Sequence, residues 1–317
     1  MSKTTGSGSF TYRVRPITLP SPIEQHLEAA HSAFVPDRAL DGGDDATWFS
    51  LKGVGLLRLT PELDRIDVVG GDSAIVASNI HGATVIHREG QTYLALASDD
   101  AERVWLTDPA GRIVRTFGNP DGQSDSSFNV CDVAYADDLL FAANGYADNV
   151  CFTCDPFQGG SDQVEQAQWG PLRFGGTGTD HGRFQVAHGI TRVPGTTVLT
   201  VADRENARLE SFTSQGRYLG GLPLPPGARP CSVDYVDRFA LVACLEGPGG
   251  STPAPIYVFD DGNLVSEINI GRDLGLAGFD HIHNAAFRVI ENGTGSRDFF
   301  VLAYAWDPGN LAILEPA

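Results

Sequence analysis

Lysine is nearly absent from this sequence, and positive charge is scarce throughout it. Lys3 and Lys52 are the only lysines, and acidic residues outnumber basic ones by 40 to 22, which gives a formal net charge of −18. An acidic surface of this kind repels the phosphates of nucleic acids and of anionic membranes. We therefore expect neither nucleic acid nor membrane among the partners, and we interpret the charge as a well-solvated surface.

Long hydrophobic runs are missing too, and cysteine is sparse. No apolar run approaches the length that spans a bilayer, and residues 1–9 are polar, with no apolar core behind them. We expect no signal peptide. The cysteines number five, an odd count, so we expect reduced thiols and a cytoplasmic protein. Cys151 and Cys154 have the spacing of half a zinc site, but the sequence has no second pair to complete it.

The sequence does contain a repeat, which is clearest between Gly182 and Phe212. Three short β-rich runs lie in this stretch, separated by tight polar turns: Ile190–Val193, Val198–Val201 and Arg208–Phe212. This pattern predicts most of one antiparallel four-stranded blade.

Four other segments align with His188-Gly189, and a β-rich run follows each of them: Asn79–Gly82, Asn129–Asp132, Pro230–Ser232 and Ile282–Asn284. A unit that recurs about every 50 residues is typical of propeller blades. A weaker first blade comes from the runs Thr47–Lys52, Leu56–Leu59 and Arg65–Val69. The sequence therefore predicts an all-β fold, a single six-bladed β-propeller over residues 1–317.

The two ends of the chain are expected to meet in one blade. Residues 10–15 alternate as a strand does, and residues 310–314 form a last strand-like run. Propellers commonly close by pairing an N-terminal strand into the final blade, which removes free sheet edges. Between these parts, residues 21–45 are less regular, with a candidate short helix at 23–33 and an acidic loop at 41–45.

Three of the aligned positions are histidines: His81, His188 and His283. They fall in alternate blades, at the start of each innermost strand, so we expect their side chains to surround one point in the central channel. Three imidazoles with further coordination positions open would suit a catalytic zinc ion, although copper, iron or nickel would also accept them. The alternative is a set of hydrogen-bonded core histidines. Cys131 and Cys231 hold the same position in two other blades, and we interpret them as small channel-lining residues rather than ligands.

The aligned segments resemble NHL repeats, and the central ones are similar to peptidyl-α-hydroxyglycine α-amidating lyase, the lyase domain of peptide amidation. The most specific match is G-R-F-Q-V-A-H-G…V-P…V-A-D-R-E-N-A-R-L-E-S-F, within residues 182–212. The resemblance covers roughly residues 75–315. It implies a six-bladed propeller enzyme in which three histidines hold zinc, and His81, His188 and His283 fall on those motifs.

The resemblance also implies two further active-site residues. Tyr146, in the turn N-G-Y-A-D-N, matches a tyrosine that acts near the metal, and Arg204, in D-R-E-N, matches an arginine. A phenol beside a cation could serve as general base, and a guanidinium could bind a substrate carboxylate with two hydrogen bonds. The alternatives are a packed turn aromatic for Tyr146 and a salt bridge to a neighbouring acid for Arg204.

The sequence departs from that family at several points. The family's other active-site arginine lies in the first blade, where the nearest counterpart is Lys52, a point charge without the arginine fork. Asn284 follows His283 where family members often place an aspartate near a calcium site. The family is typically secreted and disulfide-bonded, whereas we expect neither a signal peptide nor disulfides in this protein. We therefore expect a small-molecule substrate rather than a peptide precursor.

Three functions stay open on the sequence. The first is a metal-dependent lyase, with zinc the expected metal, that cleaves a hydroxylated carbon, such as a carbinolamide, in a small molecule. The second is a propeller hydrolase of lactones or esters, which typically needs carboxylate ligands for calcium. The third is an NHL interaction module without catalysis, which needs no histidine triad.

Overall fold

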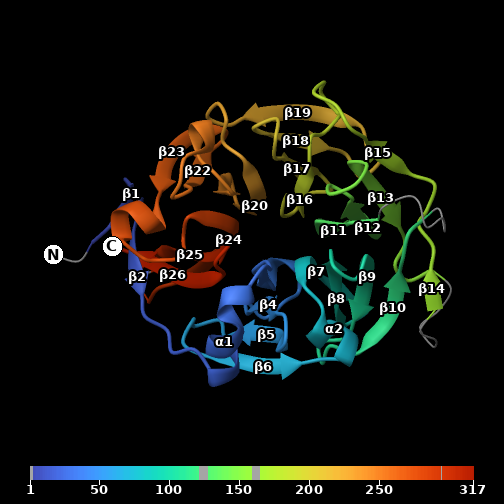
Figure 1. The fold of residues 1–317 in the computed structure, drawn as a ribbon, viewed down its shortest axis with the longest axis horizontal. Coiled ribbons are helices and arrows are strands. Elements are labelled where there is room, and N and C mark those ends of the chain that lie inside the picture. The colour runs from blue at the N-terminus through green and yellow to red at the C-terminus, as the bar shows by residue number, and fades with distance from the viewer. Residues whose placement is uncertain (1–2, 121–127, 159–164, 294) are drawn as a thin grey trace.

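Six β-sheets are arranged radially around a central axis in the computed structural model, which describes residues 3–120, 128–158, 165–293 and 295–317 (Figure 1). Five sheets have an innermost strand that begins within, or one residue before, one of the aligned motifs, and the sixth is the weaker first blade. The prediction of a six-bladed β-propeller is confirmed. No helix among the described residues is long and apolar enough to cross a membrane.

Each sheet is one blade, numbered here in chain order with the innermost strand first. Blade 1 is β3 (Val35–Pro36), β4 (Thr47–Leu51), β5 (Gly55–Leu59) and β6 (Ile66–Gly70). Blade 2 is β7 (Ile80–Arg88), β8 (Gln91–Ser98), β9 (Arg103–Thr107) and β10 (Ile113–Phe117), with β14 (Glu165–Ala167) parallel to β10. Blade 3 is β11 (Asp132–Ala136), β12 (Leu139–Ala143), β13 (Val150–Cys154) and β15 (Arg173–Gly175).

The second half of the chain repeats this plan. Blade 4 is β16 (Ala187–Arg192), β17 (Leu199–Asp203), β18 (Arg208–Phe212) and β19 (Tyr218–Pro223). Blade 5 is β20 (Pro230–Val236), β21 (Phe239–Cys244), β22 (Ile256–Asp260) and β23 (Asn263–Ile268). Blade 6 is β24 (His281–Glu291), β25 (Arg297–Trp306), β26 (Asn310–Pro316), β2 (Phe10–Arg15) and β1 (Thr5–Ser7).

Blade 6 contains the first and last strands of the chain, and β2 and β26 lie side by side in Figure 1. Strand β2 pairs antiparallel with β26, and the register places Arg13 opposite Glu315, with an ion pair of 2.8 Å. Phe10 and Tyr12 point to the core from alternate positions of β2. This pairing ties the first and last strands of the chain into one sheet and covers the outer edge of β26 where the ring closes.

The segment before β4 differs from the expected helix at 23–33. Helix α1 covers only Ser21–His26, a 3₁₀ turn follows at Leu27–Ala29, and the chain then runs extended into the channel. There the Phe34 N–H donates to Asn284 Oδ1 at 2.9 Å, and the Ser32 carbonyl accepts a hydrogen bond from His283. These bonds to blade 6 require an extended backbone, and they outweigh a weak helical propensity.

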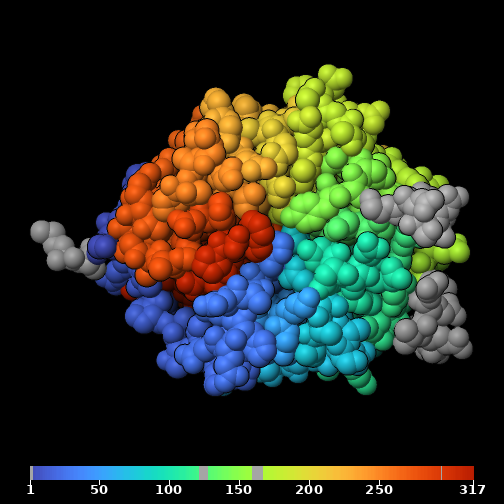
Figure 2. All heavy atoms as spheres, in the orientation of Figure 1, coloured from blue at the N-terminus to red at the C-terminus, as the bar shows by residue number. Residues whose placement is uncertain are grey.

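Neighbouring blades are held together by apolar packing and by polar bonds at the inner strands. One hydrophobic cluster joins blades 1 and 6 through Phe49, Leu57, Leu302 and Tyr304. At the inner strands, Asp132 of blade 3 accepts from the Ile190 N–H of blade 4 at 3.0 Å. Such bonds satisfy backbone groups that the innermost strands cannot pair within their own sheets. In the space-filling view, the N-terminal segment reaches the centre of the disc between blades 6 and 2 (Figure 2).

The five cysteines are buried and free. Cys151 and Cys154 lie on β13 and pack into two different hydrophobic clusters, which lie on opposite faces of the strand. Two thiols on opposite faces of one strand cannot bind one ion together. The C-x-x-C spacing is therefore not a chelating pair.

Candidate metal centre

Three buried imidazoles meet in the channel where the innermost strands of blades 2, 4 and 6 begin. His81, His188 and His283 are each only 2–3% exposed. Their ring centroids are 4.9 Å apart for His81 and His188, 4.4 Å for His81 and His283, and 5.2 Å for His188 and His283. The repeat accounts for this meeting, because each histidine begins its blade at the same height in the ring.

Each histidine is oriented by a backbone carbonyl of the following blade. The Nδ1 to carbonyl oxygen distances are 2.6 Å for His81 and Cys131, 2.9 Å for His188 and Cys231, and 2.9 Å for His283 and Ser32. A carbonyl oxygen can only accept, so the hydrogen of each neutral ring lies on Nδ1 and Nε2 carries a lone pair. Metal-binding histidines are commonly held by this kind of outer bond.

In blades 2 and 4 a glycine follows the histidine. Because it has no side chain, it leaves room for the carbonyl that bonds that histidine. A Cβ on Gly82 would lie 2.6 Å from the Cys131 oxygen, and a Cβ on Gly189 would lie 2.5 Å from the Cys231 oxygen. Both distances are too short for any side chain. The His-Gly dipeptide of blades 2 and 4 therefore places the imidazole and also admits the group that orients it.

Gly189→Ala is expected to lower the free energy of unfolding by about 1–3 kcal/mol and to weaken metal binding, because blade 5 must move away from His188. Denaturant unfolding and metal analysis of the purified variant would measure the two effects. Gly220, on β19, has open space at its Cβ position, so Gly220→Ala should change stability by no more than about 0.5 kcal/mol. Equal effects of the two substitutions would contradict this explanation.

The Nε2 atoms of His81, His188 and His283 form a set of acceptors that suits a cation. His81 Nε2 and His283 Nε2 face each other at 3.0 Å, and the Tyr146 hydroxyl lies 3.1 Å from His81 Nε2 and 2.9 Å from His188 Nε2. One hydroxyl hydrogen cannot serve three lone pairs. Burial lowers the pKa of His81 to about 4. Burial also lowers the pKa of His188, with His81 and His283 as further causes, and that of His283, with His81 as a further cause, so all three rings stay neutral at pH 7. Zinc accepts three such nitrogens and keeps a position open for substrate.

Tyr146 and Arg204 lie beside this ring in turns of blades 3 and 4. The turn between β12 and β13 carries Tyr146, and the turn between β17 and β18 carries Arg204. The Arg204 guanidinium carbon is 5.6 Å from the centroid of the Tyr146 ring. Burial raises the pKa of the Tyr146 phenol, an effect that Arg204 opposes. Arg204 also bonds the acid next to it, since its Nε lies 3.0 Å from Glu205 Oε1.

Lys52, the nearest counterpart that the resemblance offered for the family's other arginine, lies in an ion pair. Its Nζ is 2.6 Å from Asp100 Oδ2, and its side chain is 48% exposed. The structure thus brings His81, His188, His283, Tyr146 and Arg204 together, while Lys52 binds an aspartate of the next blade.

His31 also belongs to this cluster, and the sequence reasoning missed it. Its ring centroid is 4.5 Å from that of His81 and 4.3 Å from that of His283, and it packs against Trp306 at 5.3 Å. One ligand nitrogen from each of His31, His81 and His283 lies within 4.8 Å of the others. Burial, together with His283 and His81, lowers the pKa of His31. The repeat could have found it, because residue 31 lies one blade length before His81.

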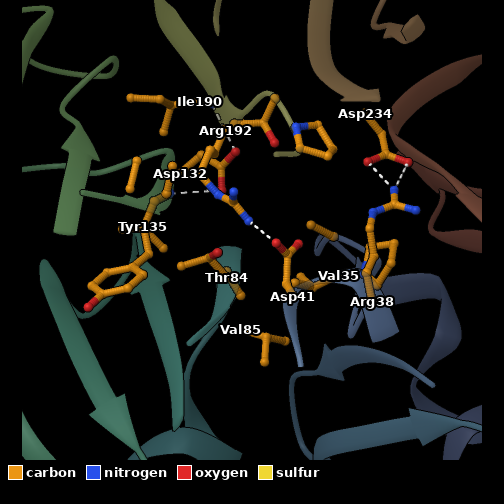
Figure 3. Close-up of a pocket in the computed structure, with 18 of the residues that line it drawn as sticks. Val35, Arg38, Asp41, Thr84, Val85, Asp132, Tyr135, Ile190, Arg192 and Asp234 are labelled. Atoms are coloured by element: carbon orange, nitrogen blue, oxygen red, sulfur yellow. Dashed lines mark hydrogen bonds and ion pairs between the residues drawn. The ribbon is translucent and has the colours of Figure 1, made fainter. Parts of the chain in front are cut away.

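A cavity of about 410 Å³ lies on the other side of the histidines from Tyr146, lined by the residues that follow them along the innermost strands. Figure 3 shows how residues 35–41 cross this cavity: Arg38 binds Asp234 of blade 5, and Asp41 binds Arg192 of blade 4. Burial raises the pKa of Asp132, in its wall, to about 7. The ion pairs fix the segment that leads from Ser32 to β4, so they support the carbonyl that orients His283.

No protein-family model and no curated protein matches the chain. Solved structures do resemble it. A streptogramin B lyase structure has a TM-score of 0.56 at 11% identity, covering 97% of this chain and 99% of that one. A catalytically inactive virginiamycin B lyase from Staphylococcus aureus with quinupristin has a TM-score of 0.51 at 14% identity, covering 86% of this chain and 77% of that one. The chain shares their propeller fold. At these identities the likeness shows the fold alone.

Proposed function

We propose that this protein is a zinc-dependent lyase that cleaves a carbinolamide-like hydroxylated carbon in a small molecule. The observation that carries the proposal is the set of three inward imidazole nitrogens, each oriented by a carbonyl of the next blade, with the Tyr146 hydroxyl within hydrogen-bond distance of two of them. The resemblance to amidating lyase motifs supports the reaction class, and structures named as lyases share the fold.

His81, His188 and His283 would hold the metal through Nε2. A zinc ion bound there supplies a Lewis acid that polarises a substrate oxygen. The other propeller enzymes considered above, lactone and ester hydrolases, typically bind calcium through carboxylates. An all-nitrogen donor set favours zinc over calcium, and so favours the lyase.

Tyr146 and Arg204 would act on the substrate directly. As a phenolate, the form that a cation held by the three histidines would favour, Tyr146 would accept the proton of the substrate hydroxyl while the carbonyl double bond forms and the carbon–nitrogen bond breaks. The bonding electron pair leaves with the nitrogen, which takes up a proton, so an amide and an aldehyde are released with no other reactant. The Arg204 guanidinium, which flanks the Tyr146 ring, would orient a substrate carboxylate.

The test uses purified protein, zinc and N-benzoyl-α-hydroxyglycine as a carbinolamide probe. We expect about one zinc ion per chain, and release of benzamide and glyoxylate in equal amounts, faster than in buffer with zinc alone. A chelator should abolish the reaction, and added zinc should restore it. Hydrolysis of an ester or lactone without cleavage of the probe would favour the hydrolase, and a protein without metal or turnover would favour an interaction module.

A further inference from the structure

We propose that His31 is a fixed hydrogen-bond donor of this site, which binds the carbonyl oxygen of the amide that leaves the substrate. The inference rests on the proposed lyase function for the identity of the ligand. It assigns to His31 a role unlike that of the three histidines beside it.

His31 occupies the rim of the histidine cluster from the side of blade 1. It lies edge-on to the rings of His81 and His283, at angles of 78° and 68°, and Trp306 packs against it. Tyr146 contacts His81 and His188. His31 therefore contacts the pair His81 and His283, whereas Tyr146 contacts the pair His81 and His188. We expect a substrate bound at the three histidines to lie within reach of both.

A chain of polar groups sets the tautomer of His31. Asn79 Nδ2 lies 2.8 Å from Asp99 Oδ1 and 3.1 Å from His31 Nδ1. A carboxylate only accepts, so the amide nitrogen of Asn79 must face it, and the second amide hydrogen is then directed at His31 Nδ1. His31 Nδ1 is an acceptor, and the hydrogen of the neutral ring lies on Nε2.

This tautomer is the reverse of the one in the other three rings. His81, His188 and His283 donate from Nδ1 and present lone pairs at Nε2, whereas His31 accepts at Nδ1 and presents an N–H at Nε2. A nitrogen that carries hydrogen does not bind a metal. By distance alone His31 would be grouped with the metal ligands. Its hydrogen bonds instead leave an Nε2–H that can donate to the substrate. Among the described residues, the hydrogen bonds of His31 engage only Nδ1, so the Nε2–H is available to a ligand.

The reaction creates a need for such a donor. When the carbon–nitrogen bond breaks, its electron pair moves onto the amide, and part of the charge lies on the amide oxygen. A neutral N–H held in place by Asn79 and Asp99 stabilises that charge without reorganisation. The proton that Tyr146 removed from the hydroxyl returns to the nitrogen, so the step is balanced.

Nuclear magnetic resonance tests the tautomer without any substrate. In zinc-loaded protein with ¹⁵N-labelled histidine, long-range ¹H–¹⁵N correlations should show the Nε2–H form for His31 and the Nδ1–H form for His81, His188 and His283. Asn79→Asp replaces the amide donor with a carboxylate acceptor and should reverse the His31 tautomer. An Nδ1–H signal for His31 in the unmodified protein would overturn the proposal.

Variants then test the role in turnover of N-benzoyl-α-hydroxyglycine. His31→Leu should lower kcat/KM by about a hundredfold with zinc content unchanged, as expected for the loss of one such donor, and His31→Gln, which keeps an N–H, should recover part of the loss. His281 also packs against Trp306, so His281→Leu is the matched control and should stay near full activity. Loss of zinc in His31→Leu, or activity equal to that of the unmodified protein, would contradict the proposal.

The two proposals can fail separately. If the unmodified protein does not cleave the probe, the lyase function fails, and benzamide then serves as the ligand for His31. A shift of the His31 Nε2–H signal on adding benzamide, absent in the Asn79→Asp variant, would support amide binding by this residue. No shift in the unmodified protein would overturn it.

Discussion

His188→Ala is expected to remove stoichiometric zinc from this protein. Sites with four protein ligands bind zinc with about 10–16 kcal/mol, so one ligand accounts for about 3 kcal/mol, or more than a hundredfold in Kd. His188 holds a position in blade 4 that blades 2 and 6 cannot replace, because their histidines already face the same point. Metal analysis after dialysis against a weak chelator would measure the loss, and lyase turnover should fall with it.

The control is a histidine of the same channel outside the cluster. His87 lies at the far end of β7, where its Nε2 binds Asp37 at 2.6 Å. His87→Ala should keep about one zinc ion per chain, although it removes the hydrogen bond to Asp37. Full zinc content in the folded His188→Ala variant would show that the ligands lie elsewhere, and a trio of His31, His81 and His283 would be the next candidate.

The repeat explains how much of this site could be predicted from the sequence. Blades related by rotation place aligned residues at one height, so three histidines at aligned positions of alternate blades must face one another. The strands were predictable for a related reason: runs such as Arg208–Phe212 alternate clearly, and β18 has those bounds. Tyr146 and Arg204 were identified by the resemblance of their turns to amidating lyase motifs rather than by the repeat.

Blade 1 shows what the sequence could not reveal. Its innermost strand, β3, has two residues and carries no apolar run, so neither periodicity nor alignment marks it. Yet Ser32, just before it, supplies the carbonyl for His283 as Cys131 and Cys231 do for the other two histidines. A backbone carbonyl leaves no trace in residue type. The spacing of one blade length marks His31 as a candidate, but its tautomer depends on Asn79 and Asp99 of blade 2, which only the fold brings beside it.

The backbone carbonyls that bond the three histidines fix the orientation of the imidazole rings. Each histidine is held by a carbonyl of the next blade, so a shift between two blades would move the Nε2 atom of one of the three histidines. The three bonds connect blade 2 to 3, blade 4 to 5 and blade 6 to 1. The donor geometry therefore depends on closure of the whole ring, including the pairing of β2 with β26.

Tyr146→Phe is expected to lower turnover of the carbinolamide probe by about a hundredfold or more while zinc content stays unchanged. The substitution removes one oxygen, which lies 2.9 Å from His188 Nε2 and 3.1 Å from His81 Nε2, and keeps the ring over which Arg204 lies. Nothing that would hold the metal is altered. The loss should appear in kcat, because a general base acts in the transition state rather than in binding.

Two further variants make the Tyr146→Phe result specific. Tyr135 lies in the same blade, where its hydroxyl bonds Asp138 at 3.1 Å, so Tyr135→Phe should leave turnover unchanged. Arg204→Ala should raise KM more than it lowers kcat, by about tenfold to a hundredfold, because a charged hydrogen bond to a substrate carboxylate contributes about 1.5–3 kcal/mol. If Tyr146→Phe instead raises KM at constant kcat, the phenol binds substrate and does not remove its proton. Stopped-flow measurement of benzamide release with each variant, at saturating and limiting probe, separates these outcomes.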